Sequence, residues 1–109
     1  MNVQFKKGVL EMCVLALLAR KDYYGFELAE RISMEIDIAE GSLYPLLRRL
    51  RAQNYLSTYH VESAEGPSRK YYSMTEVGLR HLEGLLAEWG LLTDAINRLI
   101  EGEMKREQG

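Results

Sequence analysis

Two groups of basic side chains carry the chemistry that this chain can perform. Three arginines lie close together at Arg48, Arg49 and Arg51, and a second pair follows at Arg69 and Lys70. Guanidinium and ammonium groups donate hydrogen bonds to phosphate oxygens, and an arginine can also donate two bonds to O6 and N7 of guanine. The pattern predicts a surface that binds nucleic acid, with more contacts to phosphates than to bases.

The two signs of charge are separated along the chain, so the net charge of -2 does not describe this surface. Residues 40–74 contain five lysines and arginines against three carboxylates, whereas the residues from 76 onward contain four against seven. A phosphate backbone responds to local charge, because salt screens charges that are farther away than about 10 Å. The middle of the chain is therefore expected to bind nucleic acid despite the acidic C-terminal third.

The residue types that would support catalysis, a metal ion or a cofactor are scarce. His60 and His81 stand apart from other ligand residues, and neither a nucleophile motif nor a glycine-rich phosphate loop is present. The single cysteine, Cys13, is expected to be a small buried apolar side chain rather than a reactive thiol. The apolar run from Val9 to Ala19 includes Glu11 and is too short to cross a bilayer. We therefore expect a cytoplasmic protein that is not an enzyme and has neither a cofactor nor a membrane partner.

A helix with two unlike faces is predicted from about Ser42 to Gln53, where it would position the first basic group. At 100° per residue, four leucines fall on one narrow face and the arginines fall on the opposite side or along a flank. Pro45 is expected in the first turn, where its missing N–H costs nothing. The leucine face consists of Leu43, Leu46, Leu47 and Leu50.

The second basic group is predicted to lie on a two-stranded β-hairpin. Tyr55–Glu62 is rich in β-branched and aromatic residues, Ser63–Pro67 is a turn by composition, and Ser68–Met74 is the returning strand. Tyr71 and Tyr72 should point to opposite faces of this hairpin, so that one packs inward and the other is exposed.

Two further helices are predicted before the leucine-rich one. Residues from about Lys6 to Lys21 are apolar almost all round, so this helix is expected to be covered on several sides. Asp22–Gly25 breaks it, and Phe26–Met34 follows as a short helix whose inward stripe is Leu28, Ala29 and Ile32.

A long last helix is predicted after Thr75, which is suited to cap its N-terminus. A helix of about 30 residues extends about 45 Å, farther than the small domain in front of it, so part of its apolar side needs another partner. We therefore divide the chain into a DNA-binding domain at residues 1–74 and a dimerisation helix at residues 75–109. The apolar side chains follow the heptad spacing of a helix–helix seam: Leu82, Leu85, Trp89, Leu92, Ile96 and Leu99.

This order of elements predicts a mainly α fold with a small β-hairpin, a winged helix-turn-helix with a long C-terminal dimerisation helix. The chain also resembles the PadR family of transcriptional regulators. The resemblance rests on YYGFELAERI at 23–32, GSLYPLLRRLRAQNYL at 41–56, RKYYSMTEVG at 69–78 and Trp89 in the last helix. It implies a dimeric, usually repressing DNA-binding protein of the shorter subgroup, which has a single C-terminal helix. Its third helix would enter the major groove, and its wing would lie along the backbone or the minor groove.

Nine residues are candidates for DNA contact, and several of them have a plainer alternative. The arginines could form an ordinary solvated face, and the basic pair could be a charged edge strand that discourages strand addition. Tyr44 could pack against the second helix, and Gly25 could serve only a tight turn. DNA contact is preferred because the leucine face turns the arginines outward, most strongly for Arg48. The candidates are Tyr24, Gly25, Ser42, Tyr44, Arg48, Arg49, Arg51, Arg69 and Lys70.

Trp89 has two interpretations. It is either a core or interface tryptophan or, with its copy across a dimer axis, part of an apolar slot that stacks on a flat ligand. The resemblance implies effectors that are phenolic or planar and lipophilic. The residues expected to line such a slot are Phe5, Val9, Met12, Trp89 and Leu92.

The sequence thus indicates a homodimeric, sequence-specific transcriptional regulator that is expected to be a repressor. Two recognition helices related by a two-fold axis would read a pseudo-palindromic operator in double-stranded DNA, with half-sites about 34 Å apart. An effector at the dimer interface would weaken operator binding by favouring another arrangement of the wings. Two alternatives stay open. One is a winged-helix adaptor whose acidic last helix docks a protein partner without specific DNA binding, and the other is a small-molecule carrier or enzyme that uses the apolar slot alone.

Overall fold

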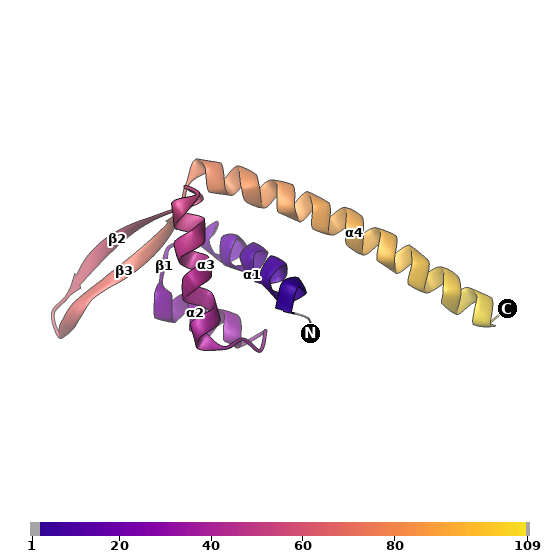
Figure 1. Ribbon diagram of the computed structural model, residues 1–109, viewed down its shortest axis with the longest axis horizontal. Helices are drawn as coiled ribbons and strands as arrows, with labels where there is room; N and C mark the ends of the chain where they lie inside the picture. Colours follow the sequence, from indigo (N-terminus) through magenta and orange to yellow (C-terminus); the bar gives the residue numbers. More distant parts are fainter. Residues whose placement is uncertain (1–2, 109) are drawn as a thin grey trace.

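Two parts of very different shape make up the structure: a head formed by the first three helices and a small sheet, and a long helix that extends away from it (Figure 1). In this computed structural model the described residues are 3–108, and the described side chains are those of residues 8–39 and 41–103. The molecule measures 66 Å along its longest axis, against 27 and 21 Å along the other two. The long helix therefore sets the shape of the chain.

The head contains the predicted helices and hairpin, with boundaries that lie within three residues of those expected. Its mainly helical fold with a small antiparallel sheet agrees with the sequence prediction. The elements in chain order are α1 (Val3–Leu18), β1 (Tyr23–Tyr24), α2 (Gly25–Ser33), α3 (Glu40–Ala52), β2 (Leu56–Ser63), β3 (Gly66–Met74) and the long helix α4 (Glu76–Gln108).

The sheet has three strands rather than the two that were predicted. β1 pairs antiparallel with β3 through Tyr23 opposite Tyr72 and Tyr24 opposite Tyr71, which gives the strand order β1-β3-β2. The sequence predicted only a break at these residues, because a two-residue strand has no periodicity of its own. Its partner strand lies far along the chain, so the pairing becomes visible only in the tertiary structure.

Pro45 lies deeper in its helix than predicted. Because α3 begins at Glu40 after the cap residue Ala39, Pro45 stands in the second turn and not in the first. Its ring nitrogen cannot donate the bond that the carbonyl of Gly41 would accept in a regular helix. Gly41 and Pro45 are both exposed, so the freed carbonyl is open to solvent and the helix continues past the proline.

Asn54 ends α3 and turns the chain into β2. Its φ of 64° is the left-handed conformation, which asparagine tolerates better than most residues. The N–H of Asn54 donates to the carbonyl of Arg51, and the N–H of Tyr55 donates to the carbonyl of Leu50, both at 3.0 Å. These two bonds are those of a Schellman motif, and they satisfy carbonyl groups at the end of the helix.

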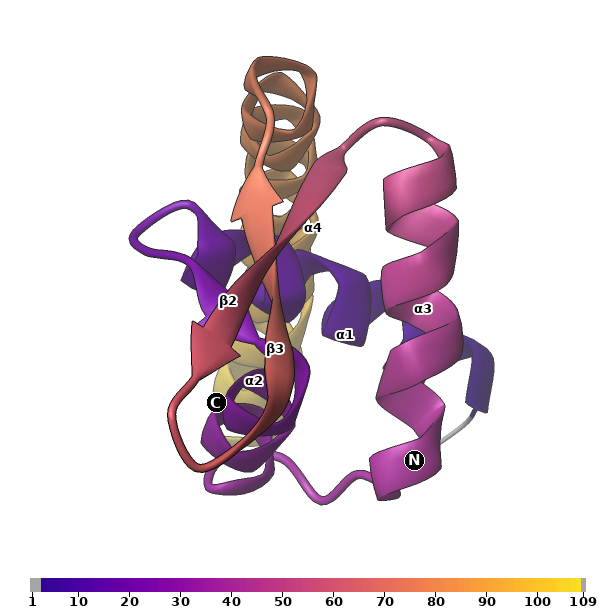
Figure 2. The same cartoon turned by 90° about the vertical axis from the view of Figure 1, so that its left-hand side faces the viewer.

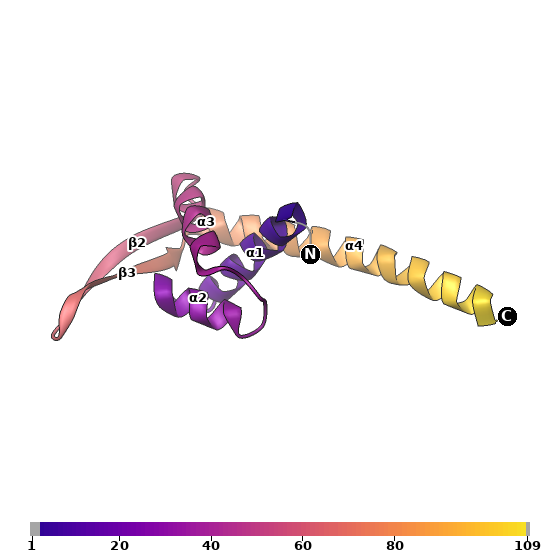
Figure 3. The same ribbon diagram turned by 60° about the horizontal axis from the view of Figure 1, so that its bottom comes forward.

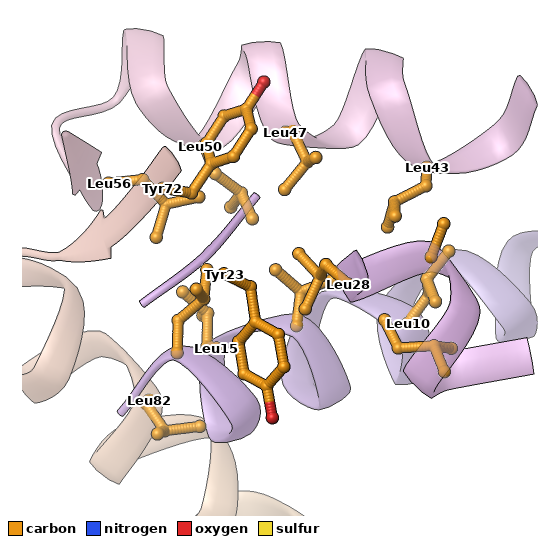
Figure 4. Close-up of a cluster of buried hydrophobic side chains, with 14 residues drawn as sticks. Leu10, Leu15, Tyr23, Leu28, Leu43, Leu47, Leu50, Leu56, Tyr72 and Leu82 are labelled. Atoms are coloured by element: carbon orange, nitrogen blue, oxygen red, sulfur yellow. The ribbon is translucent and has the colours of Figure 1, made fainter. Parts of the chain in front are cut away.

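One apolar core joins the elements of the head (Figure 4). α1 runs through it, and none of its residues from 9 to 18 is exposed, which confirms the coverage predicted from its apolar surface. The leucine face of α3 is buried as predicted, and each buried leucine stabilises the fold by roughly 1.5–3 kcal/mol. Rotation of α3 is therefore costly, and its basic side is held outward. The fully buried leucines of α3 are Leu43, Leu47 and Leu50, with Leu46 half-buried beside them.

Thr75 caps α4, as predicted, and ties it to the end of α3. Its Oγ1 accepts the N–H of Gly78 at 2.9 Å and donates to the carbonyl oxygen of Asn54 at 2.6 Å. The first turns of α4 pack against α1 and the core, where Leu82 is only 4% exposed. Neither α4 nor any other helix in the described part of the chain is long and apolar enough to cross a membrane.

Candidate nucleic-acid interface

Helix α3 and the hairpin lie at the same end of the molecule, opposite the C-terminal end of α4. Figure 2 views this end directly and shows α3 standing beside β2 and β3. Figure 3 shows the hairpin projecting beyond the head in the direction away from α4. A helix and a strand pair are thus presented together, in the arrangement of a winged helix-turn-helix.

The three arginines of α3 do not share one direction. Arg48 and Arg51 lie toward the hairpin, where both guanidinium groups act on the hydroxyl of Tyr72 in β3. Arg49 lies on another side of the helix and reaches Glu11 of α1. On a helical projection Arg48 and Arg51 are about 60° apart, whereas Arg49 is about 100° or more from each. All three side chains are exposed.

Tyr72 is the buried centre of this surface, with a side chain that is 6% exposed. The pKa of the Tyr72 hydroxyl is raised above its ordinary value, mainly by burial and to a smaller extent by the nearby Tyr44. The positive charges of Arg51 and Arg48 act in the opposite direction and lower that pKa. The ammonium group of Lys70 lies 5.7 Å from the centre of the Tyr72 ring. Two basic groups of α3 and one of the hairpin therefore lie near enough to act on a single tyrosine.

Tyr44 packs where α2 begins, which is the alternative that the sequence left open beside DNA contact. A β-carbon on Gly25 would lie 3.1 Å from Cε1 of Tyr44 and 3.8 Å from Cε2 of Tyr72. Gly25 does not have a positive φ, so this position needs its glycine for space rather than for an unusual turn. The ring of Tyr44 is half-buried and keeps part of its surface open.

Arg69 and Lys70 lie on opposite faces of the hairpin, because successive side chains of a strand alternate. Lys70 lies on the same face of the hairpin as Tyr72, and this face is turned toward the core. Arg69 shares the face of Tyr71, and its guanidinium carbon lies 4.8 Å from the centre of the Tyr24 ring. Tyr72 packs inward, as predicted for one residue of the tyrosine pair, and Tyr71 is half-buried on the other face.

A row of three tyrosines covers the outer face of the sheet and fixes the wing to β1. The ring centre of Tyr71 lies 5.6 Å from that of Tyr24 and 5.5 Å from that of Tyr59. The Tyr59 hydroxyl donates to Oδ2 of Asp22 at 2.6 Å, and this bond raises the pKa of Tyr59 because it holds the proton on the phenol. Sequence reasoning missed Tyr59 and Asp22, since they are 37 positions apart and no local pattern joins them.

Ser42 lies exposed in the first turn of α3, on the same side of the helix as Arg49. Its N–H donates to the carbonyl of Ala39 at 2.9 Å. The N-terminal end of a helix favours an anion, since its N–H groups carry partial positive charge. The position is therefore suited to a phosphate oxygen.

Arg49 has an acidic partner that the sequence did not predict. Its Nη1 lies 3.4 Å from Oε1 of Glu11 and donates to Oε1 of Gln53 at 3.0 Å. The same oxygen of Glu11 lies 3.5 Å from Nε2 of His81, whose ring stacks on that of Tyr55 with 4.0 Å between the centres. Helices α1, α3 and α4 thus meet at one carboxylate. The only sequence signal was a glutamate within the apolar run from Val9 to Ala19, a group that needs a partner when it is buried.

Comparison with known proteins decides the class of this fold. The sequence model of the transcriptional regulator PadR-like family matches residues 14–84, a range that includes α2, α3, the hairpin and the start of α4. The chain belongs to the PadR-like family. Its members are transcriptional regulators rather than enzymes, and the match confirms the predicted DNA-binding winged-helix class.

Individual PadR-like proteins match over most of their length. A PadR-like transcriptional regulator from Bacillus cereus strain ATCC 14579 is 36% identical, with a TM-score of 0.80 over 89% of this chain and 96% of that one. A PadR family transcriptional regulator from Eggerthella lenta DSM 2243 is also 36% identical, with a TM-score of 0.79 over 91% of this chain and 88% of that one. An uncharacterised protein from Lysinibacillus sphaericus is 32% identical over 100 residues, which are 88% of this chain and 92% of the relative.

In this PadR-like chain the heptad stripe of α4 changes its surroundings along the helix. Leu82 belongs to the core of its own head, and Leu85 packs against that core, so both are covered within one chain. The later residues of the stripe are exposed: Trp89 at 37%, Leu92 at 52%, Ile96 at 42% and Leu99 at 71%. The uncovered part of the stripe therefore begins at the tryptophan.

The residues expected to line an effector slot lie on two helices that pack together, α1 and α4. Val9 and Met12 are half-buried on α1, whereas Trp89 and Leu92 are exposed on α4. The side chain of Phe5 lies outside the described side chains. Within the described part of the chain, no group of three or more histidine, cysteine, aspartate or glutamate residues is placed to hold a metal ion.

Proposed function

We propose that this PadR-like protein is a homodimeric repressor that binds a pseudo-palindromic operator through α3 and the wing. The observation that carries the proposal is that α3, with Arg48 and Arg51 exposed, stands beside the hairpin that carries Arg69 and Lys70. Because the buried leucine face holds α3 in one orientation, the basic groups of helix and wing are offered to DNA together. A helix in the major groove and a cationic strand beside it then contact neighbouring parts of one duplex.

The candidate residues divide between base contact and phosphate contact. Arg48 and Arg51 are assigned to the major groove, where one or two side chains read bases. Arg69 and Lys70 are assigned to phosphates, from the two faces of the wing. Ser42 is assigned to a phosphate at the N-terminal end of α3, where the helix dipole favours an anion.

Three other candidates, Tyr24, Gly25 and Tyr44, mainly position the elements that form the interface. Tyr24 supports the guanidinium of Arg69 through its ring. Gly25 leaves the space in which Tyr44 packs, and this contact sets the start of α2 against α3. We assign to these residues an indirect part in DNA affinity, through the angle between the two helices and the position of the wing.

A second copy of the chain is the partner proposed for the uncovered stripe of α4. Apolar side chains at heptad spacing pack against another helix, and their burial drives association. Residues 1–74 then form the DNA-binding unit and residues 75–109 form the dimerisation helix, whose first turns also complete the core of the head. Two heads related by a two-fold axis would face half-sites about 34 Å apart.

An effector site is proposed where two such chains meet. The half-buried Val9 and Met12 and the exposed Trp89 and Leu92 would supply apolar walls, together with Phe5. A planar aromatic or lipophilic compound gains stacking energy against the tryptophan, roughly 0.5–1.5 kcal/mol beyond its area burial. If it binds better to the dimer geometry that does not fit DNA, it releases the operator.

The test is a mobility-shift titration against DNA from upstream of the gene itself and of its neighbours, at two salt concentrations. We expect one fragment to bind specifically and more tightly at low salt. The double variant Arg48→Ala/Arg51→Ala should lower that affinity on the order of 100-fold, since each bidentate base contact contributes about 1–3 kcal/mol. Arg98→Ala is the matched control, because Arg98 is also exposed but lies far along α4.

The outcomes separate the rival functions. Equal weak affinity for every fragment, unchanged in the double variant, would reduce the interaction to non-specific attraction and contradict the proposal. The absence of any DNA binding would leave the winged-helix adaptor as the better description. A dimer that binds flat apolar ligands but no DNA would favour a carrier.

A further inference from the structure

Glu11 lies at the junction of the three helices that connect the dimerisation helix to the recognition helix. Its side chain is 16% exposed, against 48% for Arg49 and 29% for His81. A single oxygen, Oε1, is 3.4 Å from Nη1 of Arg49 and 3.5 Å from Nε2 of His81. Two potential cations from α3 and α4 therefore face the same carboxylate oxygen of α1.

His81 is incompletely bonded in this position. Its Nε2 is buried and makes no hydrogen bond to any described group, although the carboxylate of Glu11 lies just beyond bonding distance. A neutral ring either donates an N–H from Nε2 or, as the other tautomer, turns the lone pair of Nε2 toward a negative oxygen. Only a protonated ring brings a positive charge to Glu11 together with an N–H. Glu11 of α1 and the ring of Tyr55 lie against His81, and Glu11 in turn contacts Arg49 of α3.

Arg49 remains able to bind DNA while it contacts Glu11. Both of its contacts here use Nη1, so three of its five N–H donors, on Nε and Nη2, are not used by them. A phosphate beside α3 would nevertheless compete with Glu11 for this guanidinium. Any shift of Arg49 toward DNA leaves less positive charge beside the carboxylate of Glu11, and protonation of His81 restores a positive charge there.

We propose that Glu11 is a positioning residue for DNA binding. It pairs with Arg49 in the free protein, and it pairs with protonated His81 when Arg49 turns to the DNA backbone. The inference rests on the proposed DNA-binding function. By linkage, operator binding then takes up a proton at His81, and protonation at His81 strengthens operator binding by the same factor. Histidine is the side chain suited to this exchange, because its charge changes between about pH 5 and 8.

The sign of the effect follows from the charges. Above the range in which His81 is protonated, Glu11 holds Arg49 alone, and DNA must compete with it. As the pH falls, the imidazolium neutralises Glu11 and releases Arg49, so affinity rises. Exposed ion pairs have modest strength, so we expect roughly a threefold gain per subunit, or about tenfold for a dimer, between pH 8 and pH 6.

The experiment measures operator affinity of the full-length protein at pH 6 and pH 8, at constant ionic strength. The operator affinity of the wild-type dimer should be about tenfold higher at pH 6 than at pH 8, from roughly threefold per subunit. Glu11→Gln keeps the shape and a hydrogen-bonding oxygen but removes the charge, so its affinity at pH 8 should rise toward the wild-type value at pH 6. In Glu11→Gln and in His81→Gln the pH dependence should fall below about twofold.

The other histidine of the chain, His60, is exposed on the wing opposite Lys70, where its protonation would add positive charge beside the DNA. The pH series is therefore repeated in a His60→Gln background, in which the dependence that comes from His81 should remain. Retention of that dependence after His81→Gln in this background, or its loss in His60→Gln alone, would overturn the proposal. A merely structural role of Glu11 would lower the affinity of Glu11→Gln at every pH and leave the effect of His81 intact, which would also overturn it.

Two further measurements keep the test decisive. Melting temperatures establish that each variant is folded at both pH values. Calorimetric titration of the wild type in two buffers of different ionisation enthalpy reports the protons taken up on operator binding, and uptake should disappear in Glu11→Gln. If the wild type binds no operator, the proposed function fails. If it binds one without proton uptake, only the present inference fails.

Discussion

The carbonyl oxygen of Tyr55 lies 2.1 Å from the point that a β-carbon on Gly78 would occupy. The sulfur of Met74 lies 2.7 Å from the same point. α4 therefore crosses the turn between α3 and β2 at a distance that only a glycine permits, just where Thr75 caps the helix. The contact fixes the direction in which α4 leaves the head.

Gly78→Ala should destabilise the protein strongly, because a backbone carbonyl cannot move aside as a flexible side chain would. We expect the free energy of unfolding to fall by roughly 2–4 kcal/mol. Chemical denaturation at fixed protein concentration measures this loss.

Gly84→Ala is the matched control for this prediction. Gly84 stands in the same helix, is exposed, and has nothing within 4 Å of an added β-carbon. An alanine there should raise stability by roughly 0.5–1 kcal/mol, because alanine favours helix more than glycine does. Equal effects of the two substitutions would contradict the close approach at Gly78.

The uncovered stripe of α4 should hold the dimer together. Leu92→Asp/Ile96→Asp places two charges in the proposed seam, and the protein should become monomeric at micromolar concentration, because burial of an unpaired carboxylate is costly. Sedimentation or light scattering reads the mass directly. Leu91→Asp serves as the control, since Leu91 is 73% exposed and lies off the stripe. A dimer that survives the double substitution would place the interface elsewhere.

Alkaline pH should destabilise the head through Tyr72. Burial raises the pKa of Tyr72 in the folded protein, whereas an unfolded chain ionises its tyrosines near pH 10. The stabilising contribution is therefore complete below about pH 10 and is lost as the pH rises through the folded value. Tyr72→Phe should lose less unfolding free energy than the wild type between pH 9 and 11. Equal slopes for the two proteins would exclude Tyr72 as the source.

The wing should contribute to DNA affinity through charge alone. Lys70→Ala is expected to weaken binding to operator and to unrelated DNA by the same factor and to reduce the salt slope by about one, as for the loss of one phosphate contact. Titrations at four salt concentrations give the slope. A loss confined to the operator would instead assign a base contact to Lys70.

Local periodicity explains why the sequence predicted α3 and the hairpin well. Leu43 and Leu47 fall on one side of a helix wherever that helix is placed, and an apolar side must be buried. The sequence pattern starts α3 at Ser42, two residues later than the structure does, and so assigns Pro45 to the wrong turn. The left-handed Asn54 was a usable signal for the end of this helix, because asparagine is favoured there.

What the sequence determined by itself were the features that depend on near neighbours: the helices, the hairpin, the cap at Thr75 and the outward side of α3. Tertiary structure decided the features that join distant residues. β1 exists only because β3 is beside it, and Arg49 has a carboxylate partner only because Glu11 of α1 lies within reach. Side-chain spacing within one element follows from backbone geometry, whereas the meeting of two elements depends on how the whole core packs.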